Sequence, residues 1–326
     1  MMTGKVLLLS GDGAGPSLMQ SVETVLKAVT DEVEVLYGNI GRKAYEETGH
    51  YLPHDTLDLL DECKYIICGP IIKPDNGISP VEALSVQLDL FARVRSFRTL
   101  APGLGRKGMN VLLWGSNNIA SKEITEVPDL DGVTLSKYIK NDAYGRMMEL
   151  AAERVTSAGI NHVTCLTRDD FFPVTSGMFS ETFAEKFPAD SFDTEVVNVR
   201  EWTVDTVSGA RNDQCIICVD LYRQIVGGVL GGLTGHDHLC PRALLGTEYS
   251  LYQPFDEVQD PEGVMYEDPT PAILSMANIL DFMGMKEQSK NIDDAVLRTY
   301  ADGDTMADVG GELDIEHFTQ SIIAHL

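Results

Sequence analysis

The chain has 326 residues, of which 44% are hydrophobic and 23% are charged. A chain of this length can bury a large core, and this composition excludes a disordered or fibrous protein. Acidic residues outnumber basic ones by 50 to 25, which gives a formal net charge of -25. Such a surface repels the phosphates of nucleic acids and anionic lipid headgroups, so we expect neither as a partner.

The sequence shows no signature of export or membrane insertion. No apolar run reaches the roughly 18 to 20 residues that a bilayer-spanning helix needs, and residues 1–11 read as a strand and a glycine turn. Six cysteines are too few for a disulfide scaffold in this length. Cys215 and Cys218 lie in a strand-like run that puts their sulfurs on opposite faces, so we interpret them, like Cys63 and Cys68, as buried thiols. We expect a soluble, cytoplasmic protein.

Apolar runs and helical periodicity alternate along the chain. The elements predicted in chain order are a strand at 5–10, a helix at 17–29, strands at 33–37 and 65–68 with a helix at 57–62 between them, a helix at 81–91, a strand at 111–114, a helix at 141–158, a strand at 162–165, a helix at 177–187 and a strand at 215–219. Residues 250–266 have no period and predict a surface loop, and helices follow at 271–283 and 291–301. This alternation predicts an α/β protein whose sheet is covered by helices.

Two segments in the first hundred residues carry chemistry of their own. The glycine-rich run at residues 11–16 allows a tight turn, but its spacing is not that of a dinucleotide fingerprint. Two interpretations remain open for it, a structural turn and a ligand-binding loop. Arg93, Arg95 and Arg98 are closely spaced in a chain that is otherwise acidic. They predict either a clamp for a carboxylate or phosphate, or ion pairs with the surplus acidic residues.

A third segment combines soft-metal ligands. His236, His238 and Cys240 occupy alternate positions, which on an extended chain share one face and suit a zinc ion. No fourth ligand is evident, so solvated loop histidines are the competing interpretation.

Taken in order, these pieces resemble the isocitrate and isopropylmalate dehydrogenase family over nearly the whole chain. The matching segments are residues 11–16, 88–92 with Arg95, 146–154, 175–179, 204–205, 220–222 and 268–275. The resemblance implies two α/β domains with a cleft between them: a large domain of residues 1–98 and 236–326, and a small domain of residues 99–235 that carries the dimer interface. Residues 227–232 fall in the interface helix of the family. We expect a homodimer or a hetero-oligomer with a catalytic paralogue.

Family members oxidise a 2-hydroxy acid with NAD or NADP and decarboxylate the product with the help of Mg²⁺ or Mn²⁺. The resemblance assigns substrate binding to Ser79 and Arg95. Arg93 stands where the family has an asparagine, and we expect it to bind the substrate in partial replacement of a missing arginine. Ser85 stands where another arginine is expected, and residues 114–117 replace the family's Arg-Glu-Asn segment. The implied ligand is a small di- or tricarboxylate.

The implied metal site and proton-transfer groups depart further from the family. Asp205 matches the aspartate that one subunit gives to its neighbour's metal site. In the run Asn-Leu-Tyr-Gly-Asp-Ile-Leu-Ser-Asp, the two metal-binding aspartates become Gln224 and Gly228. Arg168 replaces the proton-transfer lysine and is a poor base because a guanidinium stays protonated. Tyr138 or Tyr144 would have to replace the family tyrosine.

The implied cofactor site is also altered. The acidic residues 256–260 replace the family's His-Gly-Ser-Ala-Pro loop, and Asp268 stands where an asparagine reads the adenine. We therefore assign no cofactor or metal to this chain. The sequence predicts a catalytically impaired member that acts as a regulatory or structural subunit or as a small-carboxylate-binding protein. The alternative is an active NAD(P)-dependent 2-hydroxy-acid dehydrogenase with altered specificity.

Overall fold

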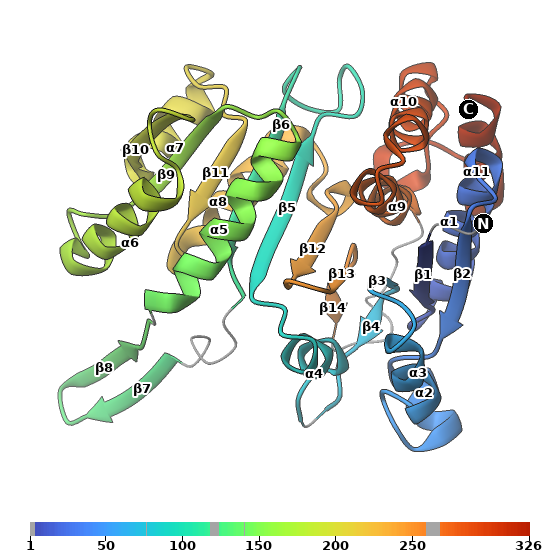
Figure 1. Cartoon of the computed structure of the whole chain (residues 1–326), viewed down its shortest axis with the longest axis horizontal. Coiled ribbons are helices and arrows are strands. Elements are labelled where there is room, and N and C mark those ends of the chain that lie inside the picture. The colour runs from blue at the N-terminus through green and yellow to red at the C-terminus, as the bar shows by residue number, and fades with distance from the viewer. Residues whose placement is uncertain (1–3, 76, 118–123, 140, 259–267) are drawn as a thin grey trace.

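A ten-stranded sheet runs through the whole molecule in the computed structural model, which describes all residues except 1–3, 76, 118–123, 140 and 259–267 (Figure 1). Its strands, from one edge to the other, are β10 (Asp193–Asn198), β9 (His162–Thr167), β11 (Cys215–Cys218), β6 (Asn110–Ser116), β5 (Ala92–Arg98), β12 (Arg242–Leu245), β13 (Ser250–Tyr252), β3 (Tyr65–Cys68), β1 (Gly4–Leu9) and β2 (Val33–Gly38). The predicted α/β class is confirmed. No helix in the described part of the chain is long and apolar enough to cross a membrane.

The middle of the sheet is antiparallel and its two wings are parallel. Strand β5 pairs antiparallel with β6 on one side and with β12 on the other, and β12 pairs antiparallel with β13. Figure 1 shows the two ends of the chain, in blue and red, on one side of this central group and the middle of the chain, in green and yellow, on the other. The predicted domain boundaries at residues 98/99 and 235/236 cut across this continuous sheet and stay a prediction.

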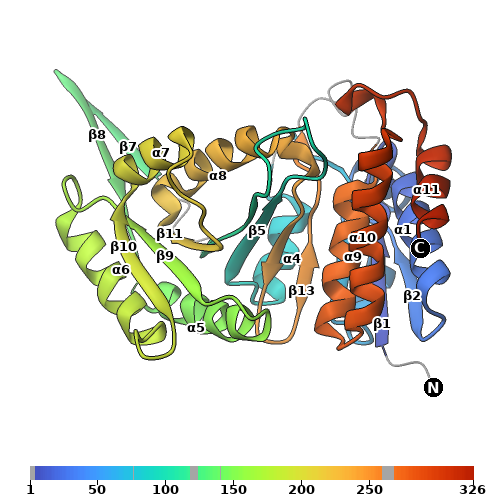
Figure 2. The same cartoon turned by 90° about the horizontal axis from the view of Figure 1, so that it is seen from above.

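Helices cover both faces of the sheet. They are α1 (Gly15–Val29), α2 (Arg42–Thr48), α3 (His54–Leu60), α4 (Pro80–Gln87), α5 (Asn141–Ser157), α6 (Pro173–Lys186), α7 (Val199–Ser208), α8 (Asp220–Thr234), α9 (Thr270–Phe282), α10 (Lys286–Asp302) and α11 (Ile315–Ala324). The face that we call the back packs against α1, α5, α6, α9 and α10, and the face that we call the front packs against α3, α4, α7 and α8. Figure 2 shows α5, α9 and α10 on one side of the sheet.

Side chains of each strand alternate between these two faces. In β1, Val6 and Leu8 belong to the back core, whereas Leu7 and Leu9 belong to a front core. In β11, Cys215 lies in the back core and Cys218 in the front core, so the prediction of buried thiols on opposite faces is confirmed. All six cysteines of the chain are free and buried.

Two shorter pairings lie outside the main sheet. Strand β4 (Ile71–Ile72) pairs with β14 (Glu257–Val258), and β7 (Ile124–Asp129) forms a hairpin with β8 (Gly132–Lys137). Strands β13 and β14 lie in residues 250–258, so the prediction of a surface loop from residue 250 was wrong there; residues 259–266 are outside the described residues. The hairpin extends away from the body of the molecule (Figures 1 and 2).

The glycine-rich run at residues 11–16 is a structural turn in which Asp12 is buried. Backbone N–H groups of Arg42, Lys43 and Ile72 donate to its carboxylate at 3.1, 2.9 and 2.8 Å. Gly11 has a φ of +70°, and a Cβ there would lie 2.3 Å from the carbonyl oxygen of Pro70. Asp12 therefore ties the start of α2 and strand β4 to the end of β1, which fixes the segment leading into the cavity described below.

We predict that Asp12→Ala lowers the free energy of unfolding by about 3 kcal/mol, because three buried N–H groups lose a charged acceptor. Urea unfolding followed by circular dichroism measures the change. Asp31→Ala, at an exposed turn, is the matched control and should stay within about 0.5 kcal/mol of the wild type. Equal stability of the two variants would contradict the role assigned to Asp12.

Candidate ligand-binding site

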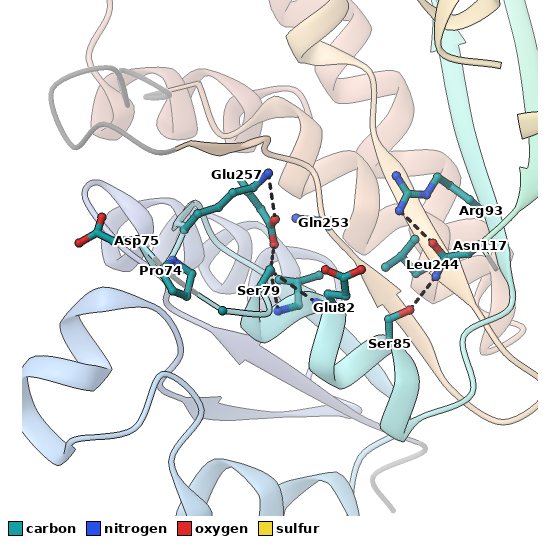
Figure 3. A pocket seen from close by; sticks show the side chains of 13 residues that line it. Pro74, Asp75, Ser79, Glu82, Ser85, Arg93, Asn117, Leu244, Gln253 and Glu257 are labelled. Atoms are coloured by element: carbon teal, nitrogen blue, oxygen red, sulfur yellow. Dashed lines mark hydrogen bonds and ion pairs between the residues drawn. The ribbon is translucent and has the colours of Figure 1, made fainter. Parts of the chain in front are cut away.

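A polar cleft lies on the front of the sheet, between α4 and α8. It consists of two adjoining cavities of about 450 and 610 Å³ that share Lys73, Arg93, Asn117, Gln253 and Glu257. Strands β5 and β12 form its floor, since Arg93 and Leu244 pair across them. We call these two cavities together the front cleft; Figure 3 shows the half next to α4.

Arg93 is the cation at the centre of the front cleft. Its Nη2 donates to the Asn117 side-chain oxygen at 2.9 Å, and its buried Nε has no hydrogen-bond partner. Among the described residues, no carboxylate lies within ion-pairing distance of it. Burial, together with the charge of Arg223, lowers the pKa of Arg93 to about 10, so the group stays protonated at neutral pH. A desolvated guanidinium without an ion-pair partner favours an anionic ligand.

Asn117 holds Arg93 in place through a buried network. Its amide nitrogen donates to the Ser85 hydroxyl at 2.6 Å and to the Leu90 carbonyl at 2.7 Å, so its oxygen must face Arg93 (Figure 3). Ser85 stands where the resemblance led us to expect an arginine. It contacts Asn117 directly, and Asn117 orients Arg93.

A second group of departures meets on the α8 side of the cleft. Arg223 lies 3.5 Å from Asp220, and the Ser116 hydroxyl donates to the other oxygen of the same carboxylate. A Cβ on Gly115 would lie 2.2 Å from Arg223 Cδ, so the missing side chain at residue 115 makes room for this arginine. Arg223 stands at the glycine of the family run quoted above, a signal that our sequence reasoning missed.

The remaining charged side chains of the front cleft are largely paired. Arg242 forms an ion pair with Asp256, and although burial acts to raise the pKa of that carboxyl, the hydrogen bond and charge of Arg242 lower it below its usual value. The Ser79 hydroxyl donates to Glu257, which also lies 3.8 Å from Lys73. Arg242 has no local sequence signal, because only the β5–β12 pairing brings it beside Arg93 and Arg95.

The three arginines of β5 have different surroundings. Arg95 pairs with Asp237 at 2.9 Å and lies over the ring of Phe97, and Arg98 pairs with Asp293 at 2.9 Å. Neither borders the front cleft. Arg95 and Arg98 therefore form ion pairs with acidic residues, which was one of the two interpretations of this arginine group. Arg93 and Ser79 do line the cleft, as a role in substrate binding requires.

The residues predicted for proton transfer, and Asp205, which was predicted as a metal ligand, lie outside the front cleft in this chain. Tyr144 is buried in the core, with its ring 4.8 Å from that of Phe179, and Tyr138 is exposed. Arg168 pairs with Asp170 at 2.8 Å, and Asp205 lies half-buried on α7. None of these four predicted residues borders the cavities, so their roles stay predictions.

The cleft does not fit a divalent cation. Gln224 borders it but carries no charge, Gly228 has no side chain, and the carboxylates of Asp220 and Asp256 face arginines. Mg²⁺ and Mn²⁺ prefer charged oxygen ligands, and the carboxylates of Asp220, Asp256 and Glu257 already face Arg223, Arg242 and Lys73.

The predicted zinc ligands do not gather at one point. Residues Asp237–Leu239 form a 3₁₀ turn rather than an extended chain, so alternate positions do not share a face. His238 binds Asp308 at 2.7 Å, and Cys240 is buried with its sulfur 3.6 Å from the Thr234 hydroxyl. The expectation of three ligands on one face was therefore wrong, and the His236 ring contacts the His238 ring edge-on.

The described residues do bring together one group with metal-ligand chemistry, far from β5. His162, Glu195 and Asp213 have ligand atoms within 4.8 Å of one another. Arg211 already neutralises this group, since it pairs with Glu195 and lies 3.0 Å from Asp213. We interpret it as an ion-pair network at the edge of the sheet formed by β9, β10 and β11.

The predicted cofactor residues are engaged with the protein itself. Asp256 and Glu257 face the front cleft, and Gln259 and Asp260 lie outside the described residues. Asp268 is buried; it accepts hydrogen bonds from the backbone N–H of Thr270 at 2.7 Å and from the Tyr300 hydroxyl at 3.0 Å. This arrangement does not fit a residue that reads an adenine ring, because both carboxylate oxygens are already in use.

Known structures share this architecture over its full length. The fold matches the crystal structure of a β-decarboxylating dehydrogenase from Thermococcus kodakarensis with a TM-score of 0.85 at 21% identity, covering 99% of this chain and 96% of the other. It matches an isocitrate dehydrogenase from Methylococcus capsulatus with a TM-score of 0.82 at 21% identity, covering 99% of both chains. The fold is thus that of the two-part α/β dehydrogenases with a cleft over a shared central sheet.

Sequence comparison identifies the family itself. The family model for isocitrate/isopropylmalate dehydrogenase matches residues 5–325, and the chain belongs to this family. It is 25% identical to an isocitrate/homoisocitrate dehydrogenase from Thermus thermophilus, over 100% of this chain and 99% of that protein. It is 23% identical to a 3-isopropylmalate dehydrogenase from Methanothermobacter thermautotrophicus, again over 100% and 99%.

Asp268 generates a pH-dependent prediction. Burial, with the charge of Asp308 and despite the hydrogen bonds from Thr270 and Tyr300, raises the pKa of this carboxyl from 3.8 to about 6. The folded protein then binds a proton more tightly than the unfolded chain, so this group lowers stability as the pH rises from about 4 to about 6. Above that range the ionised Asp268 costs on the order of 1–3 kcal/mol.

We predict that Asp268→Asn removes this cost, because an asparagine can still accept from Thr270 and donate to the Tyr300 oxygen. The variant should be more stable than the wild type at pH 8, and the difference should vanish near pH 4. Urea unfolding at the two pH values measures it, with Asp31→Asn as an exposed control. A variant that is less stable at pH 8 would show that the ionised carboxylate is favourable where it lies.

Proposed function

We propose that the front cleft binds a small di- or tricarboxylate through Arg93 without a divalent cation. On this proposal the chain is a catalytically impaired member of its family, and it acts in the cytoplasm as a regulatory or structural subunit or as a carboxylate-binding protein. Six buried, unpaired cysteines suit a reducing compartment. The observation that carries the proposal is the unpaired guanidinium of Arg93 in a cleft whose aspartates are paired with arginines.

The way the unusual residues contact one another supports retained binding over simple decay. Ser85 and Asn117 hydrogen-bond, and Asn117 in turn orients Arg93. Gly115 leaves the space that Arg223 fills. A site that had merely lost its ligand would have no need for such matched replacements, and unpaired buried cations would be costly to keep.

Arg223 also suggests how a cation requirement is avoided. It brings a permanent positive charge to the α8 side of the cleft, in the run where the family holds its metal, and its Nε lies 3.5 Å from Asp220. Arg93 and Arg223 together can therefore neutralise a ligand with two or more carboxylates. The step that needs a metal, stabilisation of an enolate during decarboxylation, has no counterpart among these residues.

An active dehydrogenase of altered specificity is the second candidate. It is favoured by the full-length similarity to proteins named as isocitrate/homoisocitrate and 3-isopropylmalate dehydrogenases. On that alternative, Arg168 and Asp205 would act in the cleft of a neighbouring subunit.

We predict that isocitrate binds with the same affinity, within about threefold, in EDTA and in Mn²⁺, because arginines supply the charge. Isothermal titration calorimetry measures the affinity. Arg93→Met should weaken binding by at least about tenfold, as expected for a lost charge-assisted pair. Arg200→Met, at an exposed position of α7, is the matched control and should bind as the wild type does.

An activity assay on the wild-type protein distinguishes the impaired family member from the active dehydrogenase. Rapid formation of NADH or NADPH on isocitrate or isopropylmalate with Mn²⁺ would establish the dehydrogenase and reject the impaired-site proposal. Binding that requires Mn²⁺ would reject the metal-free mode alone.

We further propose that the chain forms at least a dimer, either with itself or with a catalytic paralogue. Exposed residues on α8 follow one stripe, since Leu221, Ile225, Gly228 and Gly232 recur every three or four positions. The β7–β8 hairpin exposes Val127, Val133 and Leu135, and an isolated two-stranded hairpin is marginally stable in water. A partner that covers both would remove this apolar surface from solvent.

We predict that Leu135→Arg shifts the protein from a dimer to a monomer, because it places a charge in the apolar surface that the partner covers. Size-exclusion chromatography with light scattering measures the mass. Val86→Arg, at an equally exposed apolar position on α4, is the control and should leave the mass unchanged. A wild-type monomer would reject the assembly.

A further inference from the structure

A second cavity lies on the back of the central sheet, behind the floor of the front cleft. Its volume is about 370 Å³, within the range of small-molecule sites. Val94 of β5 and Trp114 of β6 are paired and face it, whereas their neighbours Arg93 and Gly115 face the front. Helix α5 and helix α9 form its two walls, so the cavity bridges the two halves of the molecule. We call it the back cavity.

Apolar side chains, three of them aromatic, form part of the lining of the back cavity. Val94, Trp114, Leu245, Tyr252 and Phe282 line it, and they come from four strands and one helix. Flat rings on several sides suit a flat or aromatic ligand, because such contacts combine burial of apolar area with edge and face packing.

Trp114 supplies a hydrogen-bond donor that the protein does not use. Its side chain is 2% exposed, and its buried Nε1 has no hydrogen-bond partner. A buried donor without an acceptor costs about 1–3 kcal/mol. The buried indole of Trp202, by comparison, donates to Asp213 at 3.0 Å. An acceptor atom on a ligand would satisfy Trp114 where the chain does not.

Arg154 gives the cavity a charge. Its guanidinium lies 3.9 Å from the centre of the Phe282 ring, and its buried Nε has no hydrogen-bond partner. The described residues place no carboxylate within ion-pairing distance of it, although the chain has 50 acidic and 25 basic residues. Lys286 adds a second cation at the exposed rim, where Asp281 also borders the cavity.

We propose that the back cavity is a second ligand site, for a small aromatic monocarboxylate. The ring lies among Trp114, Tyr252 and Phe282, and the carboxylate binds Arg154. Arg242 borders both cavities, but it pairs with Asp256, a residue of the front cleft. Arg154 and the aromatic side chains border only the back cavity, so the proposal stands whether or not the front cleft binds a di- or tricarboxylate.

The test is calorimetric titration of the wild-type protein with 3-phenylpropionate. We expect one site per chain, and at least about tenfold weaker binding of propionate, which lacks the ring, and of 3-phenylpropanol, which lacks the charge. Arg154→Gln should weaken 3-phenylpropionate at least about tenfold, whereas Arg200→Gln should not. No binding of 3-phenylpropionate by the wild-type protein up to about 5 mM would overturn the proposal.

Tryptophan fluorescence locates the bound ligand. The chain has two tryptophans, and only Trp114 borders the cavity, so 3-phenylpropionate should change the emission of the wild type but not of Trp114→Phe. Loss of binding in Arg93→Met with Arg154→Gln unaffected would place the ligand in the front cleft and overturn the assignment to the back cavity. Direct competition, in which excess isocitrate displaces 3-phenylpropionate, would also place the ligand in the front cleft and overturn the assignment.

Discussion

The antiparallel group at the centre of the sheet is the constraint on which the rest of this structure depends. Strand β5 is held on both sides by backbone ladders, to β6 and to β12, so its register is fixed. Because side chains of a strand alternate, each residue of β5 is committed to one face. Arg93 must enter the front cleft, and Val94 must enter the back cavity.

This constraint explains how one chain can depart so far from its family in the front cleft and still fold. The replaced residues are distributed over α4, β5, β6 and α8, but they contact one another in two compact groups. Ser85 and Asn117 position Arg93, and Gly115 admits Arg223 beside Asp220. Apolar core clusters lie behind them, and Trp114 of the replaced segment is itself a buried member of the back core.

The sequence predicted the buried strands well because strands covered on both faces are continuous apolar runs, as in β1, β3 and β11. Strand β5 was not predicted, since Arg93, Arg95 and Arg98 interrupt its apolar pattern. The β7–β8 hairpin was not predicted either, because exposed strands lack the apolar pattern of buried ones. In the site, Ser79 was found from the resemblance and Arg93 from the closely spaced arginines of the sequence. Arg242 could not be found locally, because its neighbours in space are distant in sequence.

The β7–β8 hairpin also forms part of the front cleft. Ile124 and Lys137 are cross-strand partners at its base, and both border the cavity that contains Arg223. A subunit that packs on the hairpin would therefore fix one wall of that cavity. Self-association and ligand affinity are then linked equilibria: the anion strengthens the assembly by the same factor by which the assembly strengthens anion binding. Protein concentration becomes a variable that sets the apparent affinity of the site.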